Sequence, residues 1–166
     1  MTGEAEAADR SEEISEESAL FRAWSKLDEP KWMQDITRGG ITQSRLDWLI
    51  YYALQVEMGE DLDASRIYET YQKWAAPKIG PIISSSQQVD TLLAYGAILQ
   101  QFISESPVTP IGRFGQVAQG LDITVGSGVA LAVAKNCDHL TQTRMFEIIE
   151  SYLVRRETCG LPRPTT

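Results

Sequence analysis

The chain is poor in the residue types that most catalytic and metal sites use. Among its 166 residues it has one histidine, His139, and two cysteines, Cys137 and Cys159. A Ser-His-Asp or Cys-His arrangement would have to use this histidine, and the three residues together would leave a zinc site one ligand short of the usual four. We therefore expect the protein not to be an enzyme and to hold no metal and no cofactor.

Long apolar runs are also absent. No run approaches the roughly 18–20 residues that a membrane-spanning helix needs, and the N-terminus lacks the basic and apolar regions of a secretory signal. The two cysteines do not form a disulfide framework. These absences predict a cytoplasmic protein with no membrane partner, and the length suits one domain with extensions.

Basic residues are outnumbered, and the imbalance is concentrated near the N-terminus. The chain carries 15 Lys and Arg against 23 Asp and Glu, a formal net charge of -8. Residues 1–37 hold ten acids and four bases (net -6), residues 38–116 eight and six (net -2), and residues 117–166 five of each. A body close to neutral neither excludes a nucleic-acid partner nor argues for one, because basic domains are the usual signature.

Composition divides the chain into three segments. Residues 1–17, MTGEAEAADRSEEISEE, hold few large apolar groups and cannot bury enough surface to offset the entropy of ordering, so we expect a disordered acidic tail. Residues 18–157 carry the periodic apolar positions of a single domain with flanking helices. Residues 158–166 have the composition of a frayed tail.

Apolar residues at helical spacing predict a series of helices, each beginning at a capping side chain. A helical turn is expected over 31–38, ended by Gly39 and Gly40. Before it, a short helix would carry on one face Leu20, Phe21, Trp24 and Leu27. The central helices are expected over 44–58, 64–76 and 85–103, and an amphipathic helix over 141–157 closes the domain.

The segment from Arg113 to Ala134, RFGQVAQGLDITVGSGVALAVA, is rich in glycine and β-branched residues. It predicts two or three short strands, although residues 129–136 could equally be helical. Three helices, a β segment and a closing helix are the order of a winged helix-turn-helix. We therefore expect a mainly α fold with a small β wing within 113–134 and extra N- and C-terminal helices.

Two short motifs occur in the expected central helices: Ile67-Tyr68-x-x-Tyr71 in the second and Leu92-x-x-x-Gly96-x-Ile98 in the third. With these motifs, about residues 41–125 resemble the winged-helix domain of archaeal Orc/Cdc-type replication initiators. The chain has no G-x-x-x-x-G-K-[ST] phosphate loop and no room for the ATPase domain of that family. The resemblance therefore implies a winged-helix module alone.

In a winged helix, the third helix reads DNA with side chains from its first turn. Gln can make two hydrogen bonds to adenine, and Ser can contact bases or phosphates. The candidate readers are Ser84, Ser85, Ser86, Gln87 and Gln88, and the candidate phosphate contacts are Lys73, Lys78, Arg45 and Arg113. These residues predict a small dimeric transcriptional regulator or replication accessory factor that binds double-stranded DNA.

The third helix carries no Lys or Arg over 85–103, which leaves a second interpretation open. The winged helix would then be an interaction module that binds a protein instead of DNA. A basic stripe beside the helix would favour DNA, whereas a contiguous exposed apolar patch would favour a protein. The last helix, 141–157, would either form a homodimer seam or pack on the domain through Met145, Ile148, Ile149, Tyr152 and Leu153.

Overall fold

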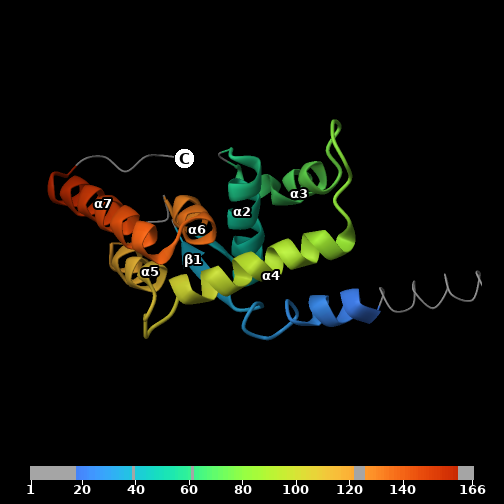
Figure 1. Cartoon of the computed structure of the whole chain (residues 1–166), viewed down its shortest axis with the longest axis horizontal. Coiled ribbons are helices and arrows are strands. Elements are labelled where there is room, and N and C mark those ends of the chain that lie inside the picture. Colours follow the sequence, from blue (N-terminus) through green and yellow to red (C-terminus); the bar gives the residue numbers. More distant parts are fainter. Residues whose placement is uncertain (1–17, 39, 61, 122–125, 161–166) are drawn as a thin grey trace, which may run out of the picture.

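The computed structural model describes residues 18–38, 40–60, 62–121 and 126–160 (Figure 1). The predicted acidic tail, and residues 161–166 of the predicted C-terminal tail, lie outside these ranges. Residues 18–25 are helical. The elements that follow are β1 (Asp35–Arg38), β2 (Ile41–Ser44), α2 (Arg45–Met58), a 3-10 turn (Ala64–Arg66), α3 (Ile67–Ala75), α4 (Ser85–Phe102), α5 (Pro110–Gly120), α6 (Ser127–Asn136) and α7 (His139–Thr158). These residues form a mainly helical fold with a small antiparallel sheet, which agrees with the expected fold class.

Helices α2 and α4 begin where their capping residues predict, whereas α3 begins three residues later than predicted, after a 3-10 turn. Ser44 and Asp47 form a capping box at the start of α2, and Gly59 ends that helix in a left-handed conformation with φ 66°. Ser84 and Gln87 form the equivalent box at the start of α4. Asp63 caps the 3-10 turn that leads into α3. These bounds are local properties of the sequence, because each cap satisfies backbone groups that the first turn of a helix leaves unpaired.

Of the β wing predicted within 113–134, residues 122–125 lie outside the described ranges, and the rest is wrong. Residues 113–120 belong to α5 and residues 127–134 to α6, so the alternative of a helix over 129–136 is the correct one. Thr109 caps α5 and Pro110 occupies its first turn, a strong helix start. Two glycines of the segment, Gly115 and Gly128, lie where a Cβ would overlap a neighbouring helix. The sequence pattern alone does not distinguish such glycines from those of turns between strands.

The sheet instead precedes the first central helix, where a helical turn was predicted over 31–38. Strands β1 and β2 pair antiparallel, with Asp35 opposite Ser44 and Arg38 opposite Ile41. The hydroxyls of Thr37 and Thr42 are hydrogen-bonded across the pair at 2.8 Å. β-Branched residues on both strands favour this pairing over a helical turn.

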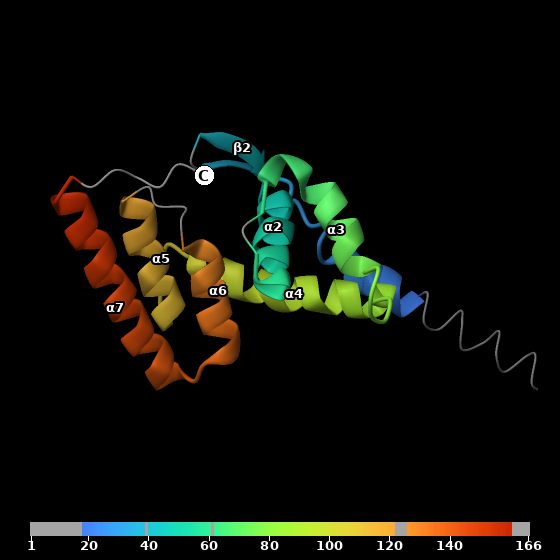
Figure 2. The same ribbon diagram turned by 90° about the horizontal axis from the view of Figure 1, so that it is seen from above.

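Helix α4 is a central element of the fold. It contacts α2, α5 and α6, while α3 packs on α2 and α7 packs on α5 and α6. The buried residues of α4 recur every three or four positions and are Val89, Leu92, Tyr95, Leu99 and Phe102. In Figures 1 and 2, α3 and the helix over 18–25 lie toward one end of α4, and α5 and α7 lie toward the other. The fold is therefore elongated along this helix.

Two glycines allow the elements around α4 to approach it closely. A Cβ on Gly96 would lie 3.2 Å from the ring of Trp32. A Cβ on Gly115 of α5 would overlap the carbonyl oxygen of Phe102, which is backbone and cannot move aside. The contact between α4 and α5 therefore requires glycine at position 115.

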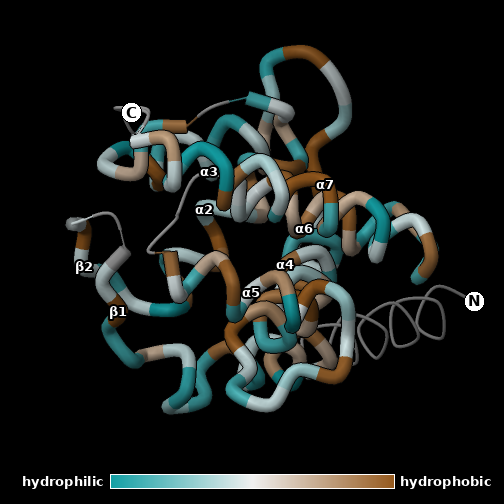
Figure 3. Tube along the Cα trace, turned by 90° about the vertical axis from the view of Figure 1, so that its left-hand side faces the viewer, coloured by the Kyte–Doolittle hydropathy of each residue, from teal (hydrophilic) through white to brown (hydrophobic). Residues whose placement is uncertain are grey.

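Helix α7 forms the outer layer of the C-terminal half. The ring of Phe146 is stacked on Phe114 of α5 with the centroids 5.0 Å apart, and Leu153 is also buried. Met145, Ile148 and Tyr152 stay exposed, so only part of the predicted apolar stripe packs on the domain. Hydropathy alternates along the trace in Figure 3, as is typical of helices that bury one face.

We expect Gly115→Ala to destabilise the protein by about 1–3 kcal/mol, the usual cost of adding a methyl group to a packed interface. Gly120→Ala is the matched control in the same helix, because a Cβ there meets no atom within 4 Å. That change should be neutral or stabilise the helix by up to about 1 kcal/mol. Urea denaturation of the three proteins measures both effects, and equal stability of the two variants would contradict the close contact.

Candidate binding site at the start of α4

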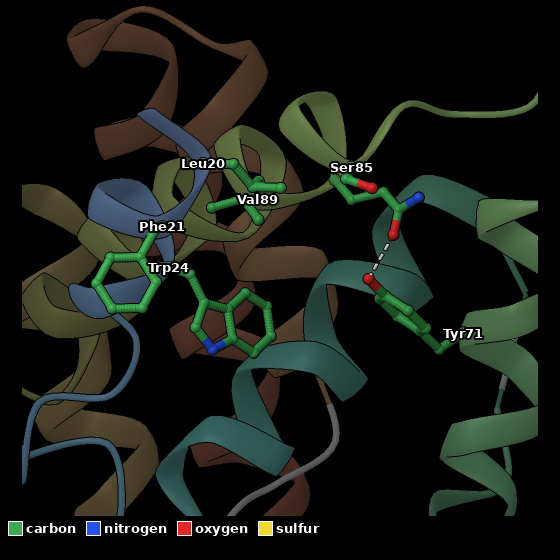
Figure 4. A pocket seen from close by; sticks show the side chains of 7 residues that line it. Leu20, Phe21, Trp24, Tyr71, Ser85 and Val89 are labelled. Atoms are coloured by element: carbon green, nitrogen blue, oxygen red, sulfur yellow. Dashed lines mark hydrogen bonds between the residues drawn. The ribbon is translucent and has the colours of Figure 1, made fainter. Parts of the chain in front are cut away.

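An apolar hollow lies beside the first turn of α4. Its volume is about 370 Å³, and it lies between the helix over 18–25, α3 and α4 (Figure 4). The lining residues are Leu20, Phe21, Trp24, Tyr71, Ser85, Gln88 and Val89. We call this feature the hollow. It has the size and the mixture of many apolar with few polar groups that binding pockets in proteins commonly show.

One wall of the hollow is held by a short chain of hydrogen bonds. The hydroxyl of Tyr71 donates to Oε1 of Gln88 at 2.5 Å, drawn as the dashed line in Figure 4. The amide nitrogen of Gln88 donates to the carbonyl oxygen of Ile83 at 2.7 Å. Partial burial raises the pKa of the Tyr71 hydroxyl above its ordinary value, so it stays protonated as a donor. The Gln88 carboxamide is thus used at both ends.

Gln87, the second glutamine among the predicted readers, also forms hydrogen bonds within the protein. The backbone N–H of Gln87 donates to Oγ of Ser84 at 3.3 Å. In return, the backbone N–H of Ser84 donates to Oε1 of Gln87 at 3.0 Å. Of the five predicted readers, Ser85 and Ser86 remain exposed on the first turn without such a role in the capping box.

The structure does not bring the four predicted phosphate contacts together. Lys73 is exposed on α3, and Lys78 is exposed in the linker between α3 and α4, so both lie on the side of the molecule where α4 begins. Arg45 is the half-buried first residue of α2. Arg113 is exposed on α5, near the opposite end of α4 (Figure 2). A single basic stripe along the expected DNA-binding helix is therefore not formed.

The first helix is more exposed than its apolar spacing predicts. Leu20, Phe21, Trp24 and Leu27 were expected to share one core face, but only Leu27 is fully buried. Phe21 is 74% exposed and Trp24 is 39% exposed, both at the rim of the hollow. The sequence feature that could have indicated this exposure is the cluster of large apolar residues on a helix of only eight residues, which is too short to bury them all.

A second cluster of polar side chains joins α2, α4 and α6. The ammonium of Lys135 donates to Glu57 at 2.6 Å and to the hydroxyl of Tyr95 at 3.0 Å, and this hydroxyl donates to Glu57 at 2.8 Å. Burial opposes ionisation of Glu57, but the hydrogen bonds from Lys135 and Tyr95 outweigh it and lower its pKa. Burial likewise opposes the charge on Lys135, yet its bonds to Glu57 and Tyr95 raise its pKa. A lysine held in the charged form is not a nucleophile, so this cluster is a structural clamp.

The residues that could bind a metal are dispersed. In the ranges that the structure describes, no three His, Cys, Asp or Glu side chains are grouped as a metal site would require. His139 is the exposed first residue of α7, Cys137 is half-buried just before it, and Cys159 is exposed beyond its end. Among the same residues, no helix combines the length and the apolar character needed to cross a bilayer.

Comparisons of the chain with protein-family models, with curated proteins and with solved structures find no match. The resemblance to the winged-helix domain of replication initiators therefore stays a prediction. Functional inference accordingly depends on the geometry of the hollow and of the surfaces around it.

We expect Gln88→Ala to lower the free energy of unfolding by about 1–2 kcal/mol, because it leaves Tyr71 and the Ile83 carbonyl without their partners. Ser86→Ala is the control on the same turn and should change stability by less than about 0.5 kcal/mol. Chemical denaturation measures both variants. Unchanged stability of the Gln88 variant would mean that its carboxamide is available to an external ligand, as the DNA-reading interpretation requires.

The clamp predicts a defined pH dependence. Because the folded-state pKa of Glu57 lies below its ordinary 4.5, the carboxylate contributes stability above that pH and loses it as the pH falls through the folded value. Glu57→Gln should therefore cost roughly 1 kcal/mol at neutral pH and much less at pH near 3. Glu69→Gln, which removes an exposed ion pair with Arg66, should cost little at either pH. A Glu57 effect that is independent of pH would contradict this account.

Proposed function

We propose that this protein is a helical interaction module that binds a partner protein through the hollow. The observation that carries the proposal is the open apolar cavity of about 370 Å³ beside the first turn of α4. An exposed apolar surface next to this helix is the feature that distinguishes a protein-binding module from a DNA-binding one. Large apolar side chains left in contact with water gain free energy when a partner covers them.

The residues of the hollow suit a bulky apolar side chain presented by a partner helix or loop. Leu20, Phe21, Trp24 and Val89 supply the apolar walls, and aromatic residues are typical of the energetic centres of protein interfaces. The exposed hydroxyl of Ser85 at one edge can hydrogen-bond a polar group of the partner. The hydrogen bonds of Gln88 hold that wall in place before binding, which reduces the entropic cost of association.

Double-stranded DNA is the second candidate partner. The observation that favours it is the exposure of Ser85 and Ser86 at the start of α4 together with Lys73 and Lys78 on the same side of the molecule. In a winged-helix arrangement, α2, α3 and α4 would be the three helices and α4 would enter the major groove. The engagement of Gln87 and Gln88 in hydrogen bonds within the protein makes this candidate the weaker one.

The test compares peptide binding by the wild type, Trp24→Lys and the control Tyr68→Lys. Tyr68 is 71% exposed on α3 and does not line the hollow, so it matches Trp24 as an exposed aromatic residue. Helical peptides selected from a display library on the wild-type protein are measured against all three by fluorescence anisotropy. We expect Trp24→Lys to weaken binding at least about tenfold, and Tyr68→Lys to leave it unchanged.

The DNA candidate is measured in parallel with a mixed pool of labelled duplexes at low salt and at physiological salt. Salt-sensitive binding that Lys73→Ala and Lys78→Ala weaken, and that Trp24→Lys does not, would replace the protein-binding proposal with DNA binding. Selected peptides whose affinity is the same for wild type and Trp24→Lys would also overturn the proposal.

A further inference from the structure

Helix α7 carries two separate apolar stripes. Phe146, Ile149 and Leu153 face the domain, where Phe146 and Leu153 are buried and Ile149 is partly buried. The second stripe consists of Met145, Ile148 and Tyr152, which have the same spacing and are 38%, 65% and 61% exposed. We call this second set the outer stripe. It lies on the helix that forms one end of the molecule in Figures 1 and 2.

Arginines border the outer stripe. Arg144 precedes Ile148 by four residues and Arg155 follows Tyr152 by three, so both lie beside the stripe on the helix surface. Both side chains are exposed, and in the described part of the chain no ion pair joins either of them. The acid Glu150 lies on the inner side of α7, where burial and Glu147 raise its pKa and Arg113 opposes that rise. Glu147 and Glu157 are also exposed, but Glu147 lies about 100° around the helix from Ile148 and Glu157 about 140° from Tyr152. The outer stripe itself is therefore apolar, with arginines along one border.

Symmetric pairing of α7 with α7 of a second copy fits this surface poorly. A two-fold interface uses the same patch on both partners. The edge that carries Arg144 and Arg155 would then meet the same edge of the other helix, and like charges at close range are destabilising. The surface instead matches an acidic segment that also brings an apolar side chain.

The chain itself contains such a segment. Residues 1–17 hold seven acids and one base, Arg10, whereas the other 149 residues hold 16 acids and 14 bases (23 - 7 and 15 - 1). Six of the eight excess negative charges of the protein are thus in this segment. Ile14 lies within its densest acidic run, which consists of Glu12, Glu13, Glu16 and Glu17.

Position and length favour an occupant from another copy of the chain. The helix over 18–25, which the acidic segment precedes, lies at the end of the molecule opposite α7 in both views (Figures 1 and 2). Seventeen residues span at most about 60 Å when extended, and the 20 residues of α7 span about 30 Å. The segment of one copy is therefore long enough to lie along α7 of the next.

We propose that the outer stripe of α7 and its arginine border bind the acidic segment 1–17 of a second copy of this chain, in a head-to-tail contact. This contact uses two different surfaces, so it joins copies head to tail into closed rings, the smallest being a pair that exchanges segments, or into open chains. The proposal is independent of the hollow and of the partner proposed for it.

The experiment measures the association of the full chain by sedimentation velocity over a concentration series, at low and at high salt. The α7 variants are Ile148→Glu and the double change Arg144→Glu with Arg155→Glu. The segment variant changes Glu12, Glu13, Glu16 and Glu17 to Lys. The matched control is Val154→Glu, because Val154 is 47% exposed on the same helix but lies about 120° around it from Ile148.

We expect the wild type and the Val154 variant to associate, with an affinity that falls as salt rises. The Ile148 variant, the double arginine variant and the segment variant should each weaken association at least about tenfold. Combining the double arginine variant with the segment variant in one chain should restore association, because the charges of the two surfaces are then exchanged. Circular dichroism confirms that each variant folds.

Three outcomes would overturn the proposal. The first is a wild-type protein that stays monomeric at every concentration. This result is also the one expected if the segment binds α7 of its own chain. The second is association that the segment variant leaves unchanged, which would indicate α7–α7 pairing. The third is failure of the exchanged-charge protein to associate although it is folded, which would mean that the contact does not depend on these charges.

Discussion

The close approach of α5 to α4 depends on the missing side chain of Gly115, and Trp32 packs on α4 at a second glycine. Gly96 leaves room for the ring of Trp32, and Gly115 lets α5 reach the backbone of Phe102. The approach of α5 also positions Phe114, on which Phe146 and the rest of α7 pack. A methyl group at position 115 would therefore disturb the whole C-terminal half.

The first turn of α4 shows why polar residues at the start of a helix are ambiguous evidence for binding. Ser84 and Gln87 satisfy each other's backbone groups, and Gln88 links α3 to the linker before α4. A helix start needs such bonds whether or not the protein has a ligand, because its first N–H groups have no partner within the helix. The nearby apolar side chains cannot be explained in this way, so they carry the functional argument.

The charges of this protein are unevenly distributed along its sequence. Glu57 and Lys135 form an ion pair between α2 and α6, and their hydrogen bonds with Tyr95 connect both helices to α4. The exposed arginines of α7 border an apolar stripe at one end of the molecule. The acidic excess lies before residue 18 and the body is close to neutral. The exposed arginines of α7 and the acids of residues 1–17 therefore carry opposite charges at different positions of one chain. Such a distribution favours a contact between unlike parts of two copies over the pairing of identical faces.

Caps and apolar periodicity predict the bounds of the central helices to within three residues, because both are local properties of the sequence. The sequence also indicated the mainly helical class and a small sheet, but it placed that sheet within 113–134, where the structure has α5 and α6. Glycines that permit close helix packing and glycines that form turns look the same in a sequence. The hollow and the outer stripe were decided only by the tertiary structure. Whether Phe21 or Ile148 is covered depends on which elements pack beside it, and periodicity shows only that a helix has an apolar face.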